Sequence, residues 1–189
     1  SALALLAAAK ACDLMGIDRK FVHAVTMPCF GTTEHTKQNA VALCNSLGVT
    51  LHTIPIADSV RSHFRDIGHD ETCHNVVYEN AQARTRADIL FNVGNAEGAF
   101  VVGTGDLSEA ALGWCTFGGD DLAHYNPNAS VPKTLVRELV KNIAATRGGD
   151  LGKVLTDIAE TPISPELVQG QETEKSVGKY ELIDFAMFF

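Results

Sequence analysis

The sequence predicts an α/β fold in which a parallel sheet is flanked by helices. The main observation is that short apolar runs alternate along the chain with helical patterns about 10–15 residues long. A second is size: 189 residues with 46% hydrophobic content can bury the core of one domain. A third is that glycine or proline ends most of these segments. Sheets of this kind bind ligands at the carboxyl ends of their strands, so we expect function in the loops that follow them.

In the first half of the chain, strands are predicted from apolar runs and helices from their end signals. Alanine and leucine at high density favour a helix at the start, and glycine stops it. Strands are expected where short apolar runs end at proline. The predicted elements are a helix from the first residues to Gly16, a strand over 21–27 closed by Pro28, a helix over 33–47 ended by Gly48, and a strand over 50–56.

The second half continues the alternation and then becomes more helical. A run rich in glycine, aspartate, asparagine and proline is expected to be a loop, and a proline in a first turn favours a helix start. The predicted elements are helices within 59–66 and 73–93, a third strand over 98–103, a loop over 118–130, a helix over 132–143 and a helical pattern over 180–189.

Composition excludes several classes of protein. Fifteen Lys and Arg residues against 23 Asp and Glu give a formal charge of -8, with no basic cluster, so we expect no nucleic-acid partner. No apolar run approaches the roughly 18 residues that would span a bilayer, so we expect no membrane segment. The five cysteines are scattered and odd in number, which is typical of reduced thiols in a cytoplasmic protein.

Both ends of the chain resemble elements cut short. Ser1 leads directly into a helical run, and residues 180–189 form a helical pattern that stops abruptly. The interpretation is one domain over residues 1–189, truncated at both ends.

The sharpest local feature is a glycine turn that follows the third predicted strand. Gly103-Thr104-Gly105 leads into a short helix, a geometry that presents backbone N–H groups to an anion. One interpretation is the G-x-G-x-x-G fingerprint of a dinucleotide-binding oxidoreductase, but Ser108 stands where the third glycine belongs. A plain tight turn without a ligand is the other interpretation, and local sequence leaves both open.

Charged residues on two predicted helices add to this picture. Lys133 lies in the first turn of a helix, where a cation is disfavoured unless an anionic partner is present. Asn80 and Arg84, four residues apart, share one side of the helix over 73–93. A solvated basic face formed by Arg84 and Arg86 is the alternative interpretation.

Five linked motifs occur in order at residues 79–84, 103–109, 111–116, 128–135 and 161–167. Together they resemble the synthetase domain of NAD+ synthases. The resemblance extends over essentially the whole chain, and the three-residue Gly-Thr-Gly form is similar to the long, glutamine-dependent branch, which carries a separate amidase domain. It implies membership of the N-type ATP pyrophosphatases and an adenine-nucleotide α-hydrolase-like fold, a Rossmann-like three-layer sandwich.

The resemblance implies a ligase that amidates deamido-NAD+ at the expense of ATP. The nicotinate carboxylate would attack the α-phosphorus of ATP, giving an acyl-adenylate and pyrophosphate. Ammonia, supplied by glutamine hydrolysis in the amidase domain, would then displace AMP. It also implies Mg2+ as the cofactor and a homo-oligomer, with the deamido-NAD+ site built across a dimer interface.

The same resemblance implies roles for individual residues. Those expected at ATP are Ser1, Val25, Met27, Thr104, Lys133 and Ser164, with Lys133 as the phosphate cation. Those expected at deamido-NAD+ are Asn80, Arg84, Glu109, Trp114, Cys115, Thr116, Phe117 and Asp120. Asp120 is expected to bind or deprotonate ammonia, and Glu109 with Ser164 to hold Mg2+. Replacing Lys133 by alanine is expected to depress pyrophosphate release by orders of magnitude and to leave the fold intact.

One departure from the family's motifs keeps an alternative open, and two other groups of residues need an interpretation. The family's phosphate loop, S-G-G-x-D-S, is represented only by Ser1, so a non-catalytic nucleotide-binding fragment is an alternative beside the oxidoreductase. His63, His69 and His74 with Cys73 match no standard zinc spacing, so no zinc is expected there. Cys115 has no base beside it and is expected to be a small buried hydrophobe rather than a nucleophile.

Overall fold

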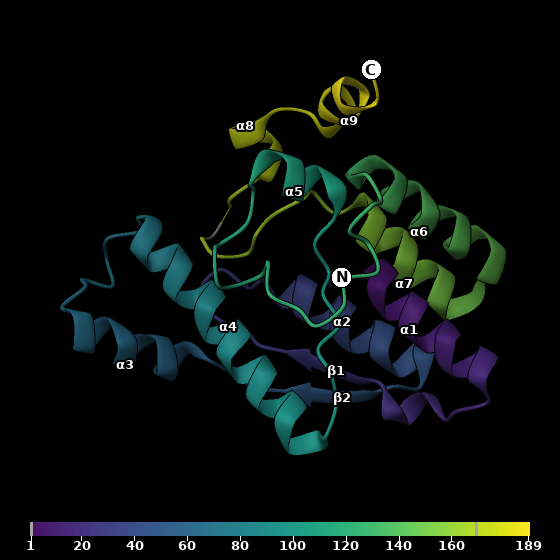
Figure 1. Cartoon of the computed structure of the whole chain (residues 1–189), viewed down its shortest axis with the longest axis horizontal. Helices are drawn as coiled ribbons and strands as arrows, with labels where there is room; N and C mark the ends of the chain where they lie inside the picture. Colours follow the sequence, from purple (N-terminus) through teal and green to yellow (C-terminus); the bar gives the residue numbers. More distant parts are fainter. Residues whose placement is uncertain (1, 169) are drawn as a thin grey trace.

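A computed structural model describes residues 2–168 and 170–189, and two parallel strands lie at its centre (Figure 1). Strand β1 (His23–Thr26) pairs with β2 (Thr50–Thr53), so that His23 lies opposite Thr50 and Thr26 opposite Thr53. Helix α2 (Glu34–Leu47) connects them, as a crossover between parallel strands must. This parallel unit with its flanking helices confirms the predicted α/β class.

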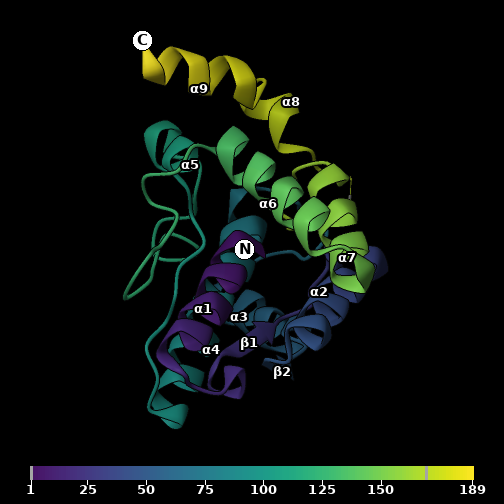
Figure 2. The ribbon, with the colours of Figure 1, turned by 90° about the vertical axis from the view of Figure 1, so that its right-hand side faces the viewer.

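Helices cover the strands on both sides and form two separate cores (Figures 1 and 2). On one side α1 (Ala2–Met15), α2, α6 (Lys133–Arg147) and α7 (Gly149–Glu160) enclose a cluster that includes Leu43, Leu47, Val140 and the fully buried Leu155. On the other, α3 (Ala57–Ile67) and α4 (Val76–Glu97) enclose Ile56, Val60, Phe64 and Tyr78.

Three short helices gather at one end of the molecule, at the top of the view in Figure 1. They are α5 (Leu107–Leu112), α8 (Thr173–Val177) and α9 (Tyr180–Phe188). A single 3-10 turn, η1 (Arg19–Phe21), precedes β1. Among the described helices none is both long enough and apolar enough to cross a membrane.

Helix ends follow the signals in the sequence. Thr33 caps α2 by accepting a hydrogen bond from the backbone N–H of Thr36. Gly48 ends the same helix in the left-handed conformation, with φ of 72°. Asn75 caps α4, and because of this the helix begins at Val76 rather than at residue 73.

The predicted third strand over 98–103 is wrong. Val102 forms one isolated bridge to Tyr125, and the neighbouring Val101 N–H donates to the His124 ring instead of to a strand. The backbone of this apolar run therefore forms its hydrogen bonds with the loop over 118–130 and not with a strand. The other strands are shorter than predicted, since η1 precedes β1, and β2 ends at Thr53, three residues before the N-cap of α3 at Ile56. Helix α7 was not predicted.

Candidate functional site

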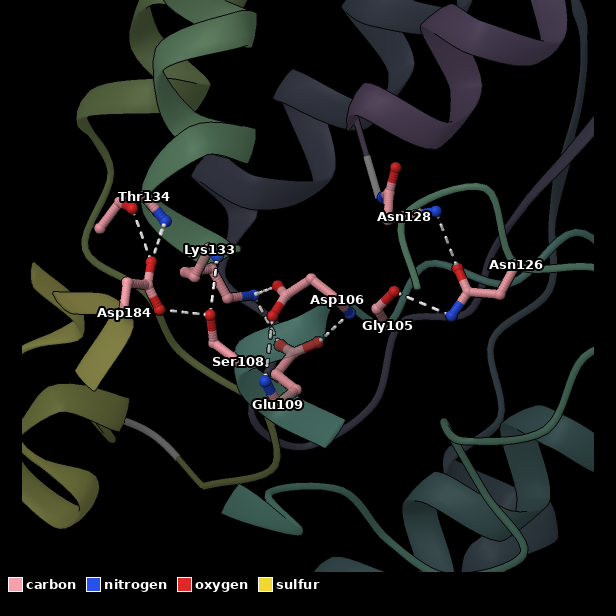
Figure 3. A network of polar contacts seen from close by, with 9 residues as sticks. All are labelled: Gly105, Asp106, Ser108, Glu109, Asn126, Asn128, Lys133, Thr134 and Asp184. Carbon is pink, nitrogen blue, oxygen red and sulfur yellow. Dashed lines mark hydrogen bonds and ion pairs between the residues drawn. The ribbon is translucent and has the colours of Figure 1, made fainter. Parts of the chain in front are cut away.

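The glycine turn after Val102 is held by close packing. A Cβ atom on Gly103 would lie 2.7 Å from the Ala123 Cβ, so only glycine fits without displacement. The Gly103 N–H donates to the Tyr125 carbonyl at 2.7 Å, and the Asn126 amide donates to the Gly105 carbonyl at 2.8 Å. The loop over 118–130 therefore fixes the turn that precedes α5 (Figure 3).

Asp106 begins α5 with a reciprocal capping box. Its carboxylate accepts from the Glu109 N–H at 3.0 Å, and the Glu109 carboxylate accepts from the Asp106 N–H at 3.0 Å. Two backbone donors that the helix leaves unpaired are thereby satisfied. The aspartate is only 2% exposed, so its charge needs a further partner.

Lys133 supplies that partner from the first turn of α6. Its ammonium lies 2.5 Å from Asp106 Oδ2 and 2.6 Å from Glu109 Oε1 (Figure 3). The same ammonium lies over the Tyr180 ring, 5.6 Å from the ring centroid. Burial alone would lower the pKa of Lys133, but the charge of Glu109 and the hydrogen bonds to both carboxylates outweigh it, and the pKa is raised. The anionic partner expected for this lysine is thus present within the chain.

A second set of hydrogen bonds joins α5, α6 and α9 beside this ion pair. The buried Ser108 hydroxyl donates to Asp184 at 2.5 Å and accepts from the Lys133 N–H at 2.8 Å. The other Asp184 oxygen accepts from the backbone and the hydroxyl of Thr134. Asp184 therefore caps the amino end of α6, although Pro132 at that end offers no side-chain cap.

Residues predicted at deamido-NAD+ form a separate group between α4 and the loop after α5. The Thr116 hydroxyl donates to Asn80 at 3.0 Å, and its N–H donates to Asp120 at 2.7 Å. Arg84 donates to the Phe117 carbonyl at 3.0 Å. The structure thus brings these five residues together, whereas the alternative interpretation was a solvated basic face formed by Arg84 and Arg86. Asn80 and Arg84 also line a small hollow of about 140 Å³.

Trp114 and Cys115 connect the two groups along the chain. The Trp114 N–H donates to the Glu109 carbonyl at 2.9 Å, which places the segment directly beyond α5. The expectation that Cys115 is buried is wrong, because the thiol is exposed. Partial desolvation and the charges of Asp120 and Asp121 raise its pKa, so the thiol form is favoured.

A third group lies at the carboxyl end of β1, where Met27 was expected near ATP but Arg86 was not. Arg86 donates to the Met27 carbonyl at 3.2 Å, directly after that strand. Burial lowers the pKa of Arg86, and the nearby Cys29 thiol and Glu166 carboxylate only partly offset that effect. Arg86 lies two positions after Arg84, so the two arginines point to different sides of α4. This spacing was the one signal in the sequence that separates the role of Arg86 from that of Arg84.

Glu166 is the other residue that the sequence analysis did not single out. Its φ of 56° makes it the one residue other than glycine with a left-handed backbone in the described ranges. Burial raises the pKa of its carboxyl group, against a hydrogen bond with Thr36 and the charge of Arg86. A Cβ on Gly31 would lie 2.5 Å from the Glu166 carbonyl oxygen, so the loop over 161–168 presses on the start of the β1–α2 connection.

The remaining predicted residues lie in different surroundings. Ser1 lies outside the described residues. Val25 is half-buried inside β1, and Thr104 is exposed at the glycine turn. The Ser164 hydroxyl accepts from the Glu166 N–H at 3.1 Å. Within the part of the chain that the structure describes, no hydrogen bond or ion pair links Ser164 to Glu109, the other expected Mg2+ ligand.

A larger hollow, of about 590 Å³, lies between α6 and α7 and contains none of the predicted residues. It is lined largely by small side chains and glycines, including Ala144, Gly148 and Gly152. Since no predicted residue and no convergent set of cations lines it, the polar groups at α5, α4 and β1 are the better candidate site.

Comparison with known proteins connects these groups to one family. Residues 1–188 match the family model described as NAD synthase. The chain is 44% identical over 197 residues to the glutamine-dependent NAD(+) synthetase of Mycobacterium tuberculosis, covering 98% of this chain and 29% of the relative. It is 35% identical to the NH(3)-dependent NAD(+) synthetase of Aeropyrum pernix, covering 97% of this chain and 62% of the relative.

Solved structures agree with the sequence matches. The NMN synthetase of Francisella tularensis superposes with a TM-score of 0.79 at 25% identity, over 100% of this chain and 73% of that one. The glutamine-dependent NAD+ synthetase of Acinetobacter baumannii, solved in complex with ADP, gives 0.70 at 27% identity, over 85% of this chain and 31% of that one. The fold is thus that of the NAD synthetases.

Proposed function

This chain belongs to the NAD synthase family, and from that premise we propose that it carries the synthetase reaction, the ATP-dependent amidation of deamido-NAD+ to NAD+. The observation that carries the proposal is that the family match extends over residues 1–188 and contains all three polar groups of the candidate site. Family membership sets aside the oxidoreductase alternative, and the turn at Gly103 is assigned to the synthetase reaction instead.

The chain spans 29% of the length of the mycobacterial relatives that it matches. We therefore assign to residues 1–189 the synthetase domain of a glutamine-dependent enzyme, and to a separate amidase domain the release of ammonia from glutamine. The product of the first step would be an acyl-adenylate with loss of pyrophosphate, and ammonia would then release AMP.

The first step joins two anions, so it requires cations and oriented N–H donors at the phosphates. Lys133 is the proposed phosphate cation, because one of its three N–H donors remains after the bonds to Asp106 and Glu109. Arg86, at the carboxyl end of β1 beside Met27, is a second cation suitably placed for a nucleotide. Thr104 and Ser164 would contribute hydroxyl groups, and Val25 and Met27 an apolar edge for the adenine.

Mg2+ is the proposed cofactor, and the residues present fit it chemically. Each Glu109 oxygen accepts one hydrogen bond and keeps a second lone pair, so the carboxylate can still act as a ligand. The Ser164 hydroxyl offers another hard oxygen, as this ion prefers. When bound, Mg2+ would neutralise charge on the ATP phosphates. Glu109 would then share its charge between Lys133 and the ion.

The second step requires ammonia beside the activated carbonyl. Asp120 is exposed and already orients the Thr116 backbone, so its second oxygen is available to accept an N–H of ammonia. Asn80, Arg84, Trp114, Cys115 and Phe117 would complete the deamido-NAD+ surface around it. Because Phe117 is 84% exposed, a second chain is proposed to cover this surface in a homo-oligomer. A cytoplasmic location fits the five free thiols.

The test is a synthetase assay with deamido-NAD+, ATP, Mg2+ and ammonium, followed by NAD+ and pyrophosphate formation. We expect both products in equal amounts, and we expect Asp120→Asn to lower NAD+ formation more than pyrophosphate release. Asp121→Asn is the matched control, since Asp121 accepts only from the Gly119 N–H nearby. Binding of both substrates without either product would assign the chain to the non-catalytic alternative.

A further inference from the structure

A cluster of two histidines and a glutamate lies where helix α4 meets the strands, apart from the three groups described above. His23 begins β1, His52 lies on β2, and Glu97 is the last residue of α4. One ligand atom from each lies within 4.8 Å of the other two. We propose that these three residues form a binding site for a divalent transition-metal ion, with Zn2+ as the ion that fits best.

The distances match those of a tetrahedral ligand set. His23 Nδ1 lies 3.1 Å from His52 Nε2 and 3.8 Å from Glu97 Oε2. A tetrahedral Zn2+ with bonds of about 2.0–2.1 Å would hold its ligand atoms about 3.4 Å apart. The observed separations lie on either side of this value, so small side-chain rotations would bring all three atoms onto one ion.

The orientation of the two imidazoles points to a shared ligand. Their rings stack with centroids 5.1 Å apart, and one nitrogen of each ring faces the other. Two such nitrogens can approach this closely only when one proton or one cation lies between them, since two lone pairs repel each other. The Glu97 carboxylate adds negative charge at the same point, which favours the cation.

The donor set selects the class of metal. Two imidazoles and one carboxylate favour zinc and similar transition metals over Mg2+ or Ca2+, which prefer oxygen ligands alone. The His23 side chain is 25% exposed and the Glu97 side chain 41%, so the site opens to solvent on one side. Water can therefore provide a fourth ligand, as in sites with three protein ligands.

The register of β1 and β2 explains why no motif in the sequence reveals this site. His23 and His52 are 29 residues apart, and the parallel pairing of Val25 with His52 makes the two histidines diagonal neighbours on one face of the sheet. Glu97 reaches them from the end of α4 beside the strands (Figure 1). The ion would thus join three elements, tying the last turn of α4 to both strands.

The experiment is calorimetric titration of the metal-free chain with Zn2+ alone. We expect one ion per chain, and an affinity that falls at least about tenfold in Glu97→Gln, because loss even of an indirect contact at a metal site costs that much. Glu97 is exposed at the end of a helix, so this variant is expected to fold. His52→Ala is expected to abolish binding.

His35→Ala is the matched control, because His35 also pairs with a carboxylate, Asp157, at 3.0 Å but belongs to no group of three possible ligands among the described residues. Its titration should equal that of the unchanged chain. A second readout is thermal unfolding, in which Zn2+ should raise the Tm of the unchanged chain and not that of His52→Ala. The proposal would be overturned if no Zn2+ bound up to about 1 mM, or if Glu97→Gln and His52→Ala bound Zn2+ as tightly as the unchanged chain. The cluster would then be a hydrogen-bonded histidine pair.

Discussion

The ion-pair group at α5 and the exposed group at Asp120 both take residues from one stretch of chain, residues 103–121, yet they differ in how their polar atoms are satisfied. Asp106 is 2% exposed and Lys133 is 17% exposed at its side chain, and each neutralises the other. In contrast, Phe117 is 84% exposed and Asp120 lies at the surface. The first group therefore stabilises the fold in addition to any role at the phosphates, whereas the second has exposed side chains that a ligand can contact.

The largest effect on the free energy of unfolding is expected for Lys133→Ala. Removal of the ammonium leaves the charge of Asp106 buried without a partner, which costs about 3–5 kcal/mol. This revises the expectation from the sequence that the fold stays intact. Urea unfolding followed by circular dichroism measures the change.

The control for this variant is the double change Lys133→Ala with Asp106→Asn. The second change removes the unpaired buried charge of Asp106, so the double variant should recover part of the lost free energy of unfolding. Unfolding midpoints of Lys133→Ala equal to those of the unchanged chain would contradict the contrast between the two groups.

A smaller effect is expected for Gly103→Ala. The added Cβ would lie 2.7 Å from the Ala123 Cβ, and such overpacking costs about 1–3 kcal/mol. Gly105→Ala is the matched control, since the atoms nearest its added Cβ lie at 3.5 and 3.8 Å. The same unfolding assay tests both. If Gly105→Ala were the more damaging change, then close packing would not be what fixes the turn.

High pH should weaken the buried group by a further, smaller amount. Lys133 has a pKa raised from 10.5, and burial raises the pKa of Tyr180 from 10.0 to about 12. Both groups keep their protons in the folded chain while the unfolded chain loses them, so their stabilising effect is complete below pH 10 and declines above it. For Tyr180 the decline is about 1–2 kcal/mol.

Thermal unfolding between pH 8 and 11 measures this decline, and Tyr180→Phe separates the two groups. The Tyr180 hydroxyl is buried without a hydrogen-bond partner among the described residues, so its loss should be tolerated at neutral pH. The variant should retain the part of the decline that Lys133 causes. A steeper decline in Tyr180→Phe would show that the tyrosine is not involved.

The smallest effect on stability is expected for Phe117→Ala, within about 0.5 kcal/mol, because the ring is exposed. Its affinity for deamido-NAD+, measured by calorimetry, should nevertheless fall by about tenfold, as loss of an aromatic contact does. Phe100→Ala is the control, since this ring is 65% exposed and outside the candidate site. Equal affinities in the two variants would place the ligand elsewhere.

Local signals in the sequence predicted some elements well, and they failed where the conformation or contact depends on a residue far away along the chain. Helix α2 was recognised because Thr33 and Gly48 lie at its ends, within reach of its own backbone. The apolar run over 98–103 looked equally good as a strand, but a strand requires a neighbour, and its neighbour is the loop at Tyr125. Arg86 was passed over because its partner, the Met27 carbonyl, is 59 residues away.

The sequence by itself determined the α/β class, the caps, the glycine turn and the linked motifs that resemble the family, because each depends on residues close together along the chain. Tertiary structure alone decided that the anionic partners of Lys133 are Asp106 and Glu109, and that His23 meets His52 and Glu97. Such pairings depend on strand register and on which helix faces meet. Those are set by the packing of two apolar cores rather than by any local pattern.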